Sequence, residues 1–266
     1  MKHSRSHIVA TLGPASNTAA VLREMVQAQL GVIRLNFSWG TLADHAAQIA
    51  IVREVEREVG HRLPIIVDLP GPRIQEAHGH TYDHAESVLT EEDKTFIAFA
   101  VEHHVDYIAM SFVGSATDIE HCRSVLKEHS GTQKIIAKIE RKIAVEHMKE
   151  IIIAADAVMV ARGDLGEEIP LEQIPFVQYR IVRMAKELGK PVIVATQMML
   201  SMTDHDTPTR AEVTDVAYAI LQGADAVMLS EETAKGKYPV EAVRMMEKIL
   251  IEAEAHMGAT RTINRL

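Results

Sequence analysis

Three charged side chains near the middle of the chain could act together on one small anion. Lys138 and Glu140 stand two residues apart at the end of the apolar run IIAKIE, and Asp164 follows the next apolar run within ARGDLG. Two carboxylates are a common protein contribution to a Mg2+ site, in which substrate and water complete the shell. A lysine ammonium beside such an ion would stabilise negative charge on an enolate or a transferring phosphoryl group. The competing interpretation is two solvated acids and a surface lysine.

Further polar residues directly follow other apolar runs, where a strand would end. Arg34, Asn36 and Ser38 alternate, so their side chains point to one side of a strand. The other polar residues at strand ends are Asp68, Ser111, Arg162, Thr196, Gln197, Ser230, Glu231 and Glu232, and Gly163 lies between Arg162 and Asp164. Unpaired charges are expensive to bury, so this convergence indicates a functional site. The simpler alternatives are a hydrogen-bonded rim, a tight turn at Gly163, and helix caps at Ser230 and Glu232.

Eight short apolar runs, each followed by a helical pattern, would position these residues. The expected strands cover residues 7–12, 32–37, 65–69, 107–112, 135–139, 157–161, 192–196 and 226–229. The expected helices cover residues 18–29, 42–59, 91–103, 116–128, 143–153, 175–188, 209–221 and 239–256. This alternation predicts the α/β class and a single-domain (β/α)8 TIM barrel over residues 1–266, with its chemistry at the C-terminal ends of the strands. A doubly wound open sheet is the structural alternative, because counting strands does not show closure.

Composition narrows the class of protein. Of the 266 residues 47% are apolar and only 4% aromatic, which suits aliphatic strands covered by helices. The formal charge of −9 and the lack of a concentrated basic segment argue against a nucleic-acid partner. The single cysteine, Cys122, cannot form an internal disulfide, which fits a reducing compartment. No apolar run approaches the ~18 residues of a membrane span. We therefore expect a cytoplasmic protein without a membrane partner.

Several segments, taken together, resemble the pyruvate kinase family. They are TLGPAS (11–16), RLNFSWG (34–40), Gly71-Pro72 after Asp68, IIAKIE (135–140), VMVARGDLG (158–166), VATQMM (194–199), PTRAE (208–212) and MLSEETAKG (228–236). Each piece alone is weak, but the set is highly specific and runs in the family's order from about residue 7 to about residue 254. The resemblance implies the catalytic barrel of that family and its site.

The resemblance also implies a role for most of the rim residues. The divalent ion, Mg2+ or Mn2+, would be bound by Glu140 and Asp164. A possible monovalent ion, K+, would be bound by Asn36, Ser38 and Asp68. The catalytic residues would be Lys138, Thr196, Arg34, Ser230 and Glu232, the last two acting as a proton relay behind Thr196. The substrate, a small anionic 2-oxo acid or phosphoenolpyruvate, would be bound by Arg34, Ala161, Arg162, Gly163, Asp164 and Thr196.

Departures from the family pattern bear on the reaction. Family members carry a lid domain after the third strand, where we expect only a short surface loop at residues 75–87, and a regulatory domain where this chain has a tail at residues 257–266. Gln75 stands where the family has a nucleotide-facing arginine, and Trp39 where it has a histidine. Three further family residues, a threonine, a glutamate and a glycine, are replaced by Leu69, Leu200 and Glu231.

These departures fall on the nucleotide side, whereas the enolate machinery is kept. They favour a Mg-dependent lyase that acts through pyruvate enolate, by oxaloacetate decarboxylation or aldol-type cleavage of a 2-oxo acid. The alternative is a minimal pyruvate kinase that transfers phosphate between phosphoenolpyruvate and ADP. A second alternative is a catalytically inactive barrel that binds a 2-oxo acid.

Two secondary features carry weaker predictions. His78, His80 and His84 share the 75–87 loop and could supply a base or a metal ligand, although a solvated loop explains them equally. A homo-oligomer is expected, because barrel surface that other domains cover in the family would be exposed here. The expected contact surface is the last helix, with Met245, Met246, Ile249 and Leu250.

Overall fold

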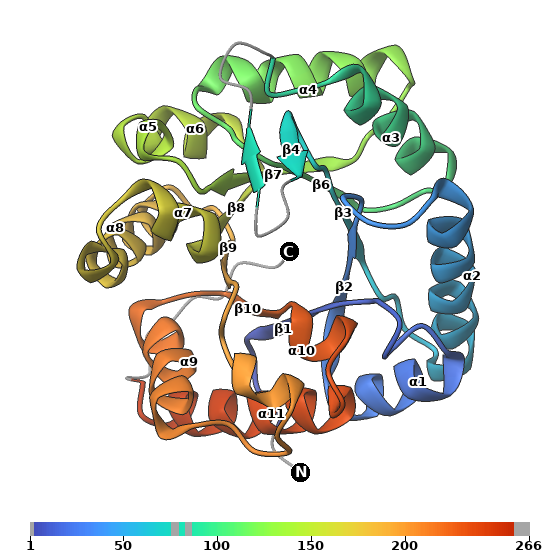
Figure 1. The fold of residues 1–266 in the computed structure, drawn as a ribbon, viewed down its shortest axis with the longest axis vertical. Coiled ribbons are helices and arrows are strands. Elements are labelled where there is room, and N and C mark those ends of the chain that lie inside the picture. Colours follow the sequence, from blue (N-terminus) through green and yellow to red (C-terminus); the bar gives the residue numbers. More distant parts are fainter. Residues whose placement is uncertain (1–2, 76–79, 83–86, 258–266) are drawn as a thin grey trace.

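Eight parallel strands close into one barrel (Figure 1). The computed structural model describes residues 3–75, 80–82 and 87–257. Around the barrel the strands follow the order β1-β10-β9-β8-β7-β6-β3-β2, and β1 pairs with both β10 and β2. This closure confirms the (β/α)8 barrel and excludes the open sheet. The strands are β1 (His7–Thr11), β2 (Leu30–Asn36), β3 (Ile65–Asp68), β6 (Tyr107–Met110), β7 (Lys134–Ile139), β8 (Ala157–Ala161), β9 (Val192–Ala195) and β10 (Ala226–Leu229).

The long helices form a layer around the outside of the barrel (Figure 1). They are α1 (Ala19–Gln27), α2 (Leu42–Val59), α3 (Glu91–Glu102), α4 (Ala116–Glu128), α8 (Ile174–Glu187), α9 (Arg210–Gln222) and α11 (Pro239–Ala255). The helix predicted at 143–153 is interrupted at His147 and forms α5 (Lys142–Glu146) and α6 (Met148–Ala154). Short helical turns that the sequence pattern did not predict are α7 (Arg162–Glu168), η1 (Leu171–Gln173), η2 (Leu200–Thr203) and α10 (Glu231–Ala234).

Local sequence signals explain where several helices begin and end. At the start of α3, the Thr90 side chain accepts a hydrogen bond from the Asp93 backbone, and Asp93 bonds back to Thr90. This capping box satisfies backbone groups that have no partner within the helix. At the other end of a helix, Gly189 follows α8 with φ +68, a conformation that glycine adopts without steric cost.

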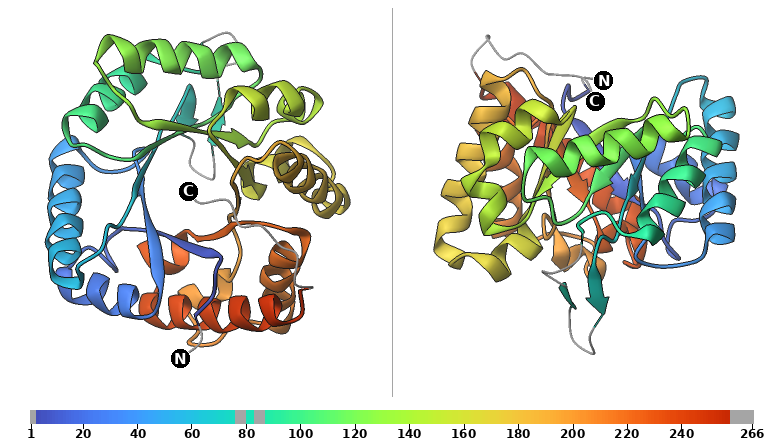
Figure 2. Two further views of the ribbon diagram at one scale, coloured as in Figure 1. Left: turned by 180° about the vertical axis from the view of Figure 1, so that it is seen from behind. Right: turned by 90° about the horizontal axis from the view of Figure 1, so that it is seen from above.

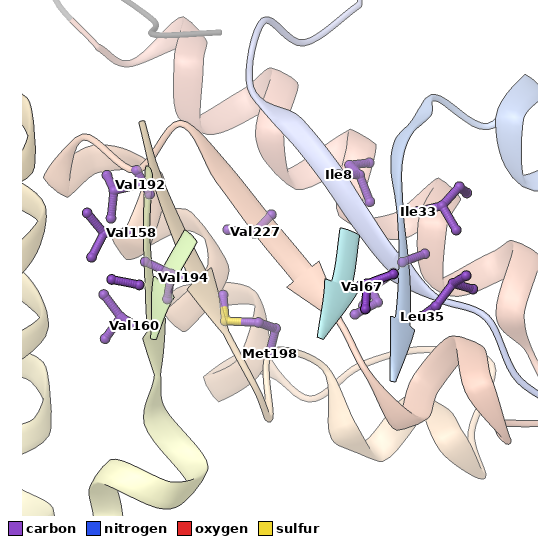
Figure 3. Packing of buried hydrophobic residues seen from close by; sticks show 14 of the residues in the cluster. Ile8, Ile33, Leu35, Val67, Val158, Val160, Val192, Val194, Met198 and Val227 are labelled. Carbon is purple, nitrogen blue, oxygen red and sulfur yellow. The ribbon is translucent and has the colours of Figure 1, made fainter. Parts of the chain in front are cut away.

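Alternation along the strands separates two apolar layers. On β8, Val158 and Val160 pack in the cluster between the strands and the helices, whereas Met159 belongs to a second cluster inside the barrel. Figure 3 shows the outer cluster, with Val192 and Val194 of β9 beside those two valines. Successive side chains of a strand point to opposite faces. Every second side chain of each barrel strand therefore points into the barrel interior.

Residues 75–87, predicted to be an unpatterned loop, contribute to a small hairpin instead. β4 (Arg73–Gln75) and β5 (His80–Tyr82) pair antiparallel, with Arg73 opposite Tyr82. The hairpin projects from one end of the barrel, where β3 ends (Figure 2). The prediction of a loop was wrong for β4 and β5. Each of these strands has only three residues, which are too few to show the two-residue period of a strand in the sequence. His78 and His84 lie outside the described residues.

The face proposed for oligomer contact is part of the core. On α11, Met246 and Leu250 are fully buried, Ile249 is nearly so, and Met245 packs partly buried against them. The prediction that this face covers a second copy was wrong, because the helix uses it to pack against the barrel. Large exposed apolar side chains gather on η1 and α8 instead, including Leu171. Within the described residues, no helix combines the length and apolar character that crossing a membrane requires.

Candidate active site

The inward face of the barrel changes from apolar to polar toward the C-terminal ends of the strands. On β2, Val32 belongs to the interior cluster and Arg34, two positions later, lines a pocket. On β7 the same change occurs between Ile136 and Lys138, and Asp68 ends β3 in the same way. Strand alternation therefore brings residues that are distant in sequence to one end of the barrel, where (β/α)8 enzymes carry their chemistry.

Lys138 is the centre of this group. Its Nζ lies 3.1 Å from Asp68 Oδ1 and 3.2 Å from Glu140 Oε2, and it donates a hydrogen bond of 2.7 Å to Ser111 Oγ. Arg34 Nε donates to the other oxygen of Asp68 at 2.7 Å. All of these side chains are buried or nearly so. One ammonium thus holds carboxylates from two different strand ends in a site with little access to water.

The charges in this group change one another's acidity. Burial alone would raise the pKa of Asp68, but the neighbouring Arg34 and Lys138 outweigh it and hold that pKa below its ordinary value. For Glu140 burial dominates, and nearby Asp164 adds to it, so its pKa is raised despite the opposing charge of Lys138. Burial would lower the pKa of Lys138, yet Asp68, Glu140 and Asp164 raise it. Lys138 is therefore a fixed positive charge at neutral pH, not a base.

The loop after β9 forms another part of the site. Thr196 has φ +69 and Gln197 φ +52, conformations that are unfavourable for residues other than glycine and most of all for a β-branched one. Thr196 Oγ1 accepts a hydrogen bond from Gly163 N–H at 2.7 Å and donates to Ala195 O at 2.6 Å. The N–H of Gly163, a residue predicted to bind the substrate, is bonded to this hydroxyl in the structure.

Arg162 stabilises this strained loop from the outside. Its guanidinium donates to Ala195 O at 3.3 Å and Thr196 O at 2.8 Å, and it pairs with Asp215 of α9 at 2.7 Å. Strained backbone persists only where its surroundings hold it in place. The structure does not bring Arg162 into the pocket, contrary to its predicted contact with substrate.

The pocket at this end of the barrel has an empty volume of about 420 Å³. Eight of the residues predicted from the sequence line it: Arg34, Asn36, Ser38, Asp68, Lys138, Ala161, Asp164 and Thr196. The other lining residues are Pro70, Arg73, Ser111, Phe112, Met159 and Met228. Predicted site residues outside the lining are Glu140, Arg162, Gly163, Ser230 and Glu232.

Glu232 lies behind the pocket and is bonded to backbone. It is fully buried, and its two carboxylate oxygens accept from Met199 N–H at 3.0 Å and Ser230 N–H at 2.7 Å. Burial raises its pKa despite these hydrogen bonds. Ser230 begins α10 without a side-chain capping bond. Both residues hold the loops after β9 and β10 together, and their part in a proton relay stays a prediction.

Glu140 and Asp164 suit a divalent cation by the chemistry of their donors. Glu140 Oε1 accepts from Phe112 N–H at 2.6 Å, while Oε2 is buried and accepts no hydrogen bond from any described group, although Lys138 is close. A buried carboxylate oxygen without a hydrogen bond is costly unless a cation accompanies it. In the described ranges no three or more His, Cys, Asp and Glu side chains cluster as metal ligands. Mg2+ typically takes one or two protein carboxylates, so the chemistry of Glu140 and Asp164 fits this ion.

The monovalent-ion set fits less well. Both oxygens of Asp68 already accept from cations, Oδ2 from Arg34 and Oδ1 from Lys138. Asn36 Oδ1 accepts from Ser38 N–H at 3.2 Å, and Leu69 offers no side-chain oxygen. Few oxygen atoms in this set are left to replace the water around a K+ ion.

Sequence reasoning missed three contributors to the site. Arg73, at the start of β4, lines the pocket, and its Nη1 donates to Ser38 Oγ at 3.3 Å. Phe112, with φ +57, turns its N–H toward Glu140. Asp215 secures Arg162 from a helix far along the chain. Only Arg73 had a signal, since a basic residue two positions before Gln75 would share its face of a strand.

A closed (β/α)8 barrel that gathers a buried lysine, two arginines and several carboxylates at its C-terminal end has the architecture of a barrel enzyme. Comparison with known proteins gives the family. Residues 3–87 and 80–243 match the family described as pyruvate kinase, barrel domain. The chain belongs to the pyruvate kinase family.

Individual relatives agree with this assignment. The chain is similar to a pyruvate kinase of Thermococcus litoralis, with 37% identity over 333 aligned positions that cover 95% of this chain and 70% of the relative. A pyruvate kinase of Mycobacterium intracellulare is 37% identical over 336 positions, covering 96% of this chain and 71% of the relative. Both alignments are longer than the 266 residues of this chain, so the relatives contain inserted segments that it lacks.

Proposed function

We propose that this chain transfers a phosphoryl group between phosphoenolpyruvate and ADP. The observation that carries the proposal is the buried ammonium of Lys138, held between Asp68 and Glu140 at 3.1 and 3.2 Å in a pocket that Arg34 also lines. Relatives at 37% identity are named pyruvate kinase. These relatives favour phosphoryl transfer over the lyase reaction, which the departures from the family pattern had favoured.

The proposed roles follow from what each side chain can contact. Toward ATP, the bond between the enol oxygen and phosphorus breaks, phosphorus bonds to a terminal oxygen of ADP, and the enolate takes a proton at its methylene carbon to give pyruvate. Lys138 would stabilise charge on the enol oxygen, because its ammonium is fixed before the reaction begins. Arg34 would hold the phosphoryl group. The Thr196 hydroxyl, in the pocket lining, is the proposed place of proton transfer.

Glu140 and Asp164 are the proposed ligands of Mg2+ or Mn2+. When bound, such an ion polarises substrate oxygens and neutralises charge that develops on them. The raised pKa of Glu140 is compatible with this role, because a buried carboxylate gains from a second cation beside it. Asn36, Ser38 and Asp68 would be the K+ ligands by resemblance, and no step of the proposed reaction depends on them.

A second candidate function is the cleavage or decarboxylation of a 2-oxo acid through pyruvate enolate. The observation that favours it is the short connection from β3 to α3, which holds only the β4–β5 hairpin among its described residues. We propose that this hairpin stands where the relatives carry their inserted segment. A domain that closes over the nucleotide excludes water from phosphoryl transfer, and its loss would affect enolate chemistry less.

Two assays on the purified chain separate these candidates. The first couples pyruvate release from phosphoenolpyruvate, ADP and Mg2+ to a dehydrogenase. The second follows pyruvate release from oxaloacetate with Mg2+ but without nucleotide. Turnover in the first that is lost without ADP supports the proposed function. Turnover in the second alone supports the lyase. An absence of activity in both assays, with Mg2+ and with Mn2+, would contradict both candidate functions and would favour a catalytically inactive barrel that binds a 2-oxo acid.

A further inference from the structure

One buried carboxylate joins the start of α3 to the chain that follows β3. Asp93 is fully buried, and its Oδ1 accepts a hydrogen bond from the Gly71 N–H at 3.2 Å. Its other oxygen accepts from the backbone N–H and from the hydroxyl of Thr90, both at 2.9 Å. Asp93 therefore does more than cap its own helix, because it also fixes a backbone group 22 positions away, at the root of the β4–β5 hairpin.

We infer that Asp93 is a positioning residue for Glu140 and thereby sets the affinity of the site for a divalent cation. The link runs from Asp93 through Gly71 to Phe112, and the Phe112 N–H in turn holds Glu140. This inference rests on the proposed function for the role of Glu140 as a metal ligand. It gives a part in metal binding to a residue that lies outside the pocket lining.

The step from Gly71 to Phe112 is a packing contact. Gly71 has φ +65, a backbone conformation that L side chains rarely adopt. A Cβ at this position would lie 2.8 Å from Cδ2 of the Phe112 ring, which is closer than van der Waals contact allows. The ring therefore lies directly against the Gly71 backbone, so a shift of that backbone removes a support of the ring.

The step from Phe112 to Glu140 is a hydrogen bond. The Phe112 N–H donates to Glu140 Oε1 at 2.6 Å, and Glu140 Oε2 lies 3.2 Å from Lys138 Nζ. Phe112 has φ +57, an unfavourable conformation that persists only where its surroundings hold it. Its carbonyl accepts from Arg141 Nη1 at 3.0 Å, and the contact of its ring with Gly71 is a further restraint. Without that restraint the N–H is free to turn, and Glu140 loses a bond that fixes its orientation.

The orientation of Glu140 matters because Mg2+ tolerates little departure from octahedral geometry. Groups that orient a metal ligand without touching the metal typically contribute about 10- to 100-fold to its affinity. Asp93 acts on Glu140 through two intermediate residues, so we expect a loss of about 10-fold, the lower end of that range. Burial raises the pKa of Asp93 despite its hydrogen bonds, so removing the carboxylate also relieves part of the cost of burying it.

Two variants interrupt the link at different points, and each has a matched control. Asp93→Ala removes the carboxylate, and Asp44→Ala removes the corresponding carboxylate from the capping box that begins α2. Gly71→Ala places a Cβ against the Phe112 ring, whereas Gly60→Ala changes a glycine at φ +75 whose Cβ would have nothing within 4 Å. The members of each pair share a local cost, a weakened helix cap or a strained φ, but the controls lie outside the link.

The dissociation constant of Mn2+ is measured on each purified chain from the electron paramagnetic resonance signal of free Mn2+, without substrate or nucleotide. Asp93→Ala and Gly71→Ala should weaken Mn2+ binding about 10-fold, and both controls should stay within about threefold of the wild type. With phosphoenolpyruvate and ADP, the first two variants should need about 10-fold more Mg2+ for the half-maximal rate but recover kcat at saturating Mg2+. Urea denaturation measures the loss of stability separately, and a merely structural role would change that measurement alone.

Mn2+ binding by Asp93→Ala within about threefold of the wild type would overturn the inference, as would equal weakening in Asp44→Ala. If Asp93→Ala does not fold, Gly71→Ala decides, and unchanged Mn2+ binding in that variant overturns the inference. A wild type that binds no Mn2+ removes the metal-ligand role of Glu140, and the inference with it. A chain that binds Mn2+ but transfers no phosphate to ADP loses the proposed reaction, yet keeps this inference where Asp93→Ala weakens the binding.

Discussion

Replacing Lys138 with methionine removes the charge on which the site depends and keeps most of the side-chain volume. The wild-type ammonium contacts Asp68 at 3.1 Å, Glu140 at 3.2 Å and Ser111 at 2.7 Å. In Lys138→Met both carboxylates stay in a buried site with one cation fewer. The same change removes the group proposed to stabilise the enol oxygen.

Two separate magnitudes follow. Breaking a buried ion pair by removing one partner destabilises a protein by about 3–5 kcal/mol. Asp68 keeps Arg34 at 2.7 Å, so we expect the lower half of that range. For catalysis, removing one preorganised donor to a developing oxyanion lowers kcat by about 10²–10³-fold. Lys138 carries a full positive charge, so the loss of kcat in Lys138→Met should lie at or above the upper end of that range.

The measurement pairs this variant with Lys186→Met. Lys186 is another partly buried lysine, and it lies 2.6 Å from the buried Asp225, whose backbone carbonyl accepts from His7 at the start of β1. Lys186 therefore belongs to the opposite end of the barrel. Urea denaturation should show both variants destabilised, whereas the phosphoenolpyruvate and ADP assay should show a large loss of kcat for Lys138→Met alone.

The reasoning fails if Lys138→Met, shown to be folded by its circular dichroism, turns over within about tenfold of the wild type. It fails equally if Lys186→Met loses as much kcat as Lys138→Met, because the loss would then reflect stability. A Lys138→Met variant that unfolds without urea is compared with the wild type at a lower temperature at which circular dichroism shows both to be folded. The folded variant must still be inactive under those conditions.

Three further outcomes follow from the structure. Hydrogen bonds from Arg5 and Ser6 outweigh burial and lower the pKa of Glu254, so Glu254→Gln should reduce the free energy of unfolding by about 1–3 kcal/mol at pH 7. A carboxylate whose pKa is lowered by folding stabilises the native state at pH values above its ordinary pKa of 4.5, and this stabilisation is lost as the pH falls. The urea midpoints of the wild type and the variant should therefore converge in acid. A gap between them that stays constant with pH would contradict this. Burial raises the pKa of the Cys122 thiol to about 12, so a disulfide reagent at pH 8 should label the native chain at least about a thousandfold more slowly than the urea-unfolded chain, and fast native labelling would refute its burial. A Cβ on Gly13 would lie 2.5 Å from the Ala234 carbonyl oxygen, so Gly13→Ala should lower the free energy of unfolding by about 1–3 kcal/mol. Gly166 lies in α7 with nothing within 4 Å of a Cβ, so Gly166→Ala should raise the free energy of unfolding by about 0.5–1 kcal/mol. Equal melting temperatures of the two variants would contradict this difference in packing.

The sequence by itself determined the strands, most of the long helices and the face of each strand that meets the pocket. Strand alternation has a period of two residues, so it is a local property that short runs such as 135–140 display directly. Arg34, Asp68 and Lys138 could be assigned to one end of the barrel for this reason. A capping box such as Thr90 to Asp93 is equally local.

Closure of the barrel, and the partner of each polar group, were decided only by the tertiary structure. The ion pair between Lys138 and Asp68 joins residues 70 positions apart, and Arg162 is bonded to Asp215 and to backbone carbonyls. No sequence period records which side chain reaches a given charge, since that depends on how distant strands are placed in three dimensions. The same reason explains why Arg73 was overlooked and why Met246, predicted for a second copy, packs inside. The period of a strand determines the side of the backbone on which a side chain lies, whereas the tertiary structure determines which groups that side chain contacts.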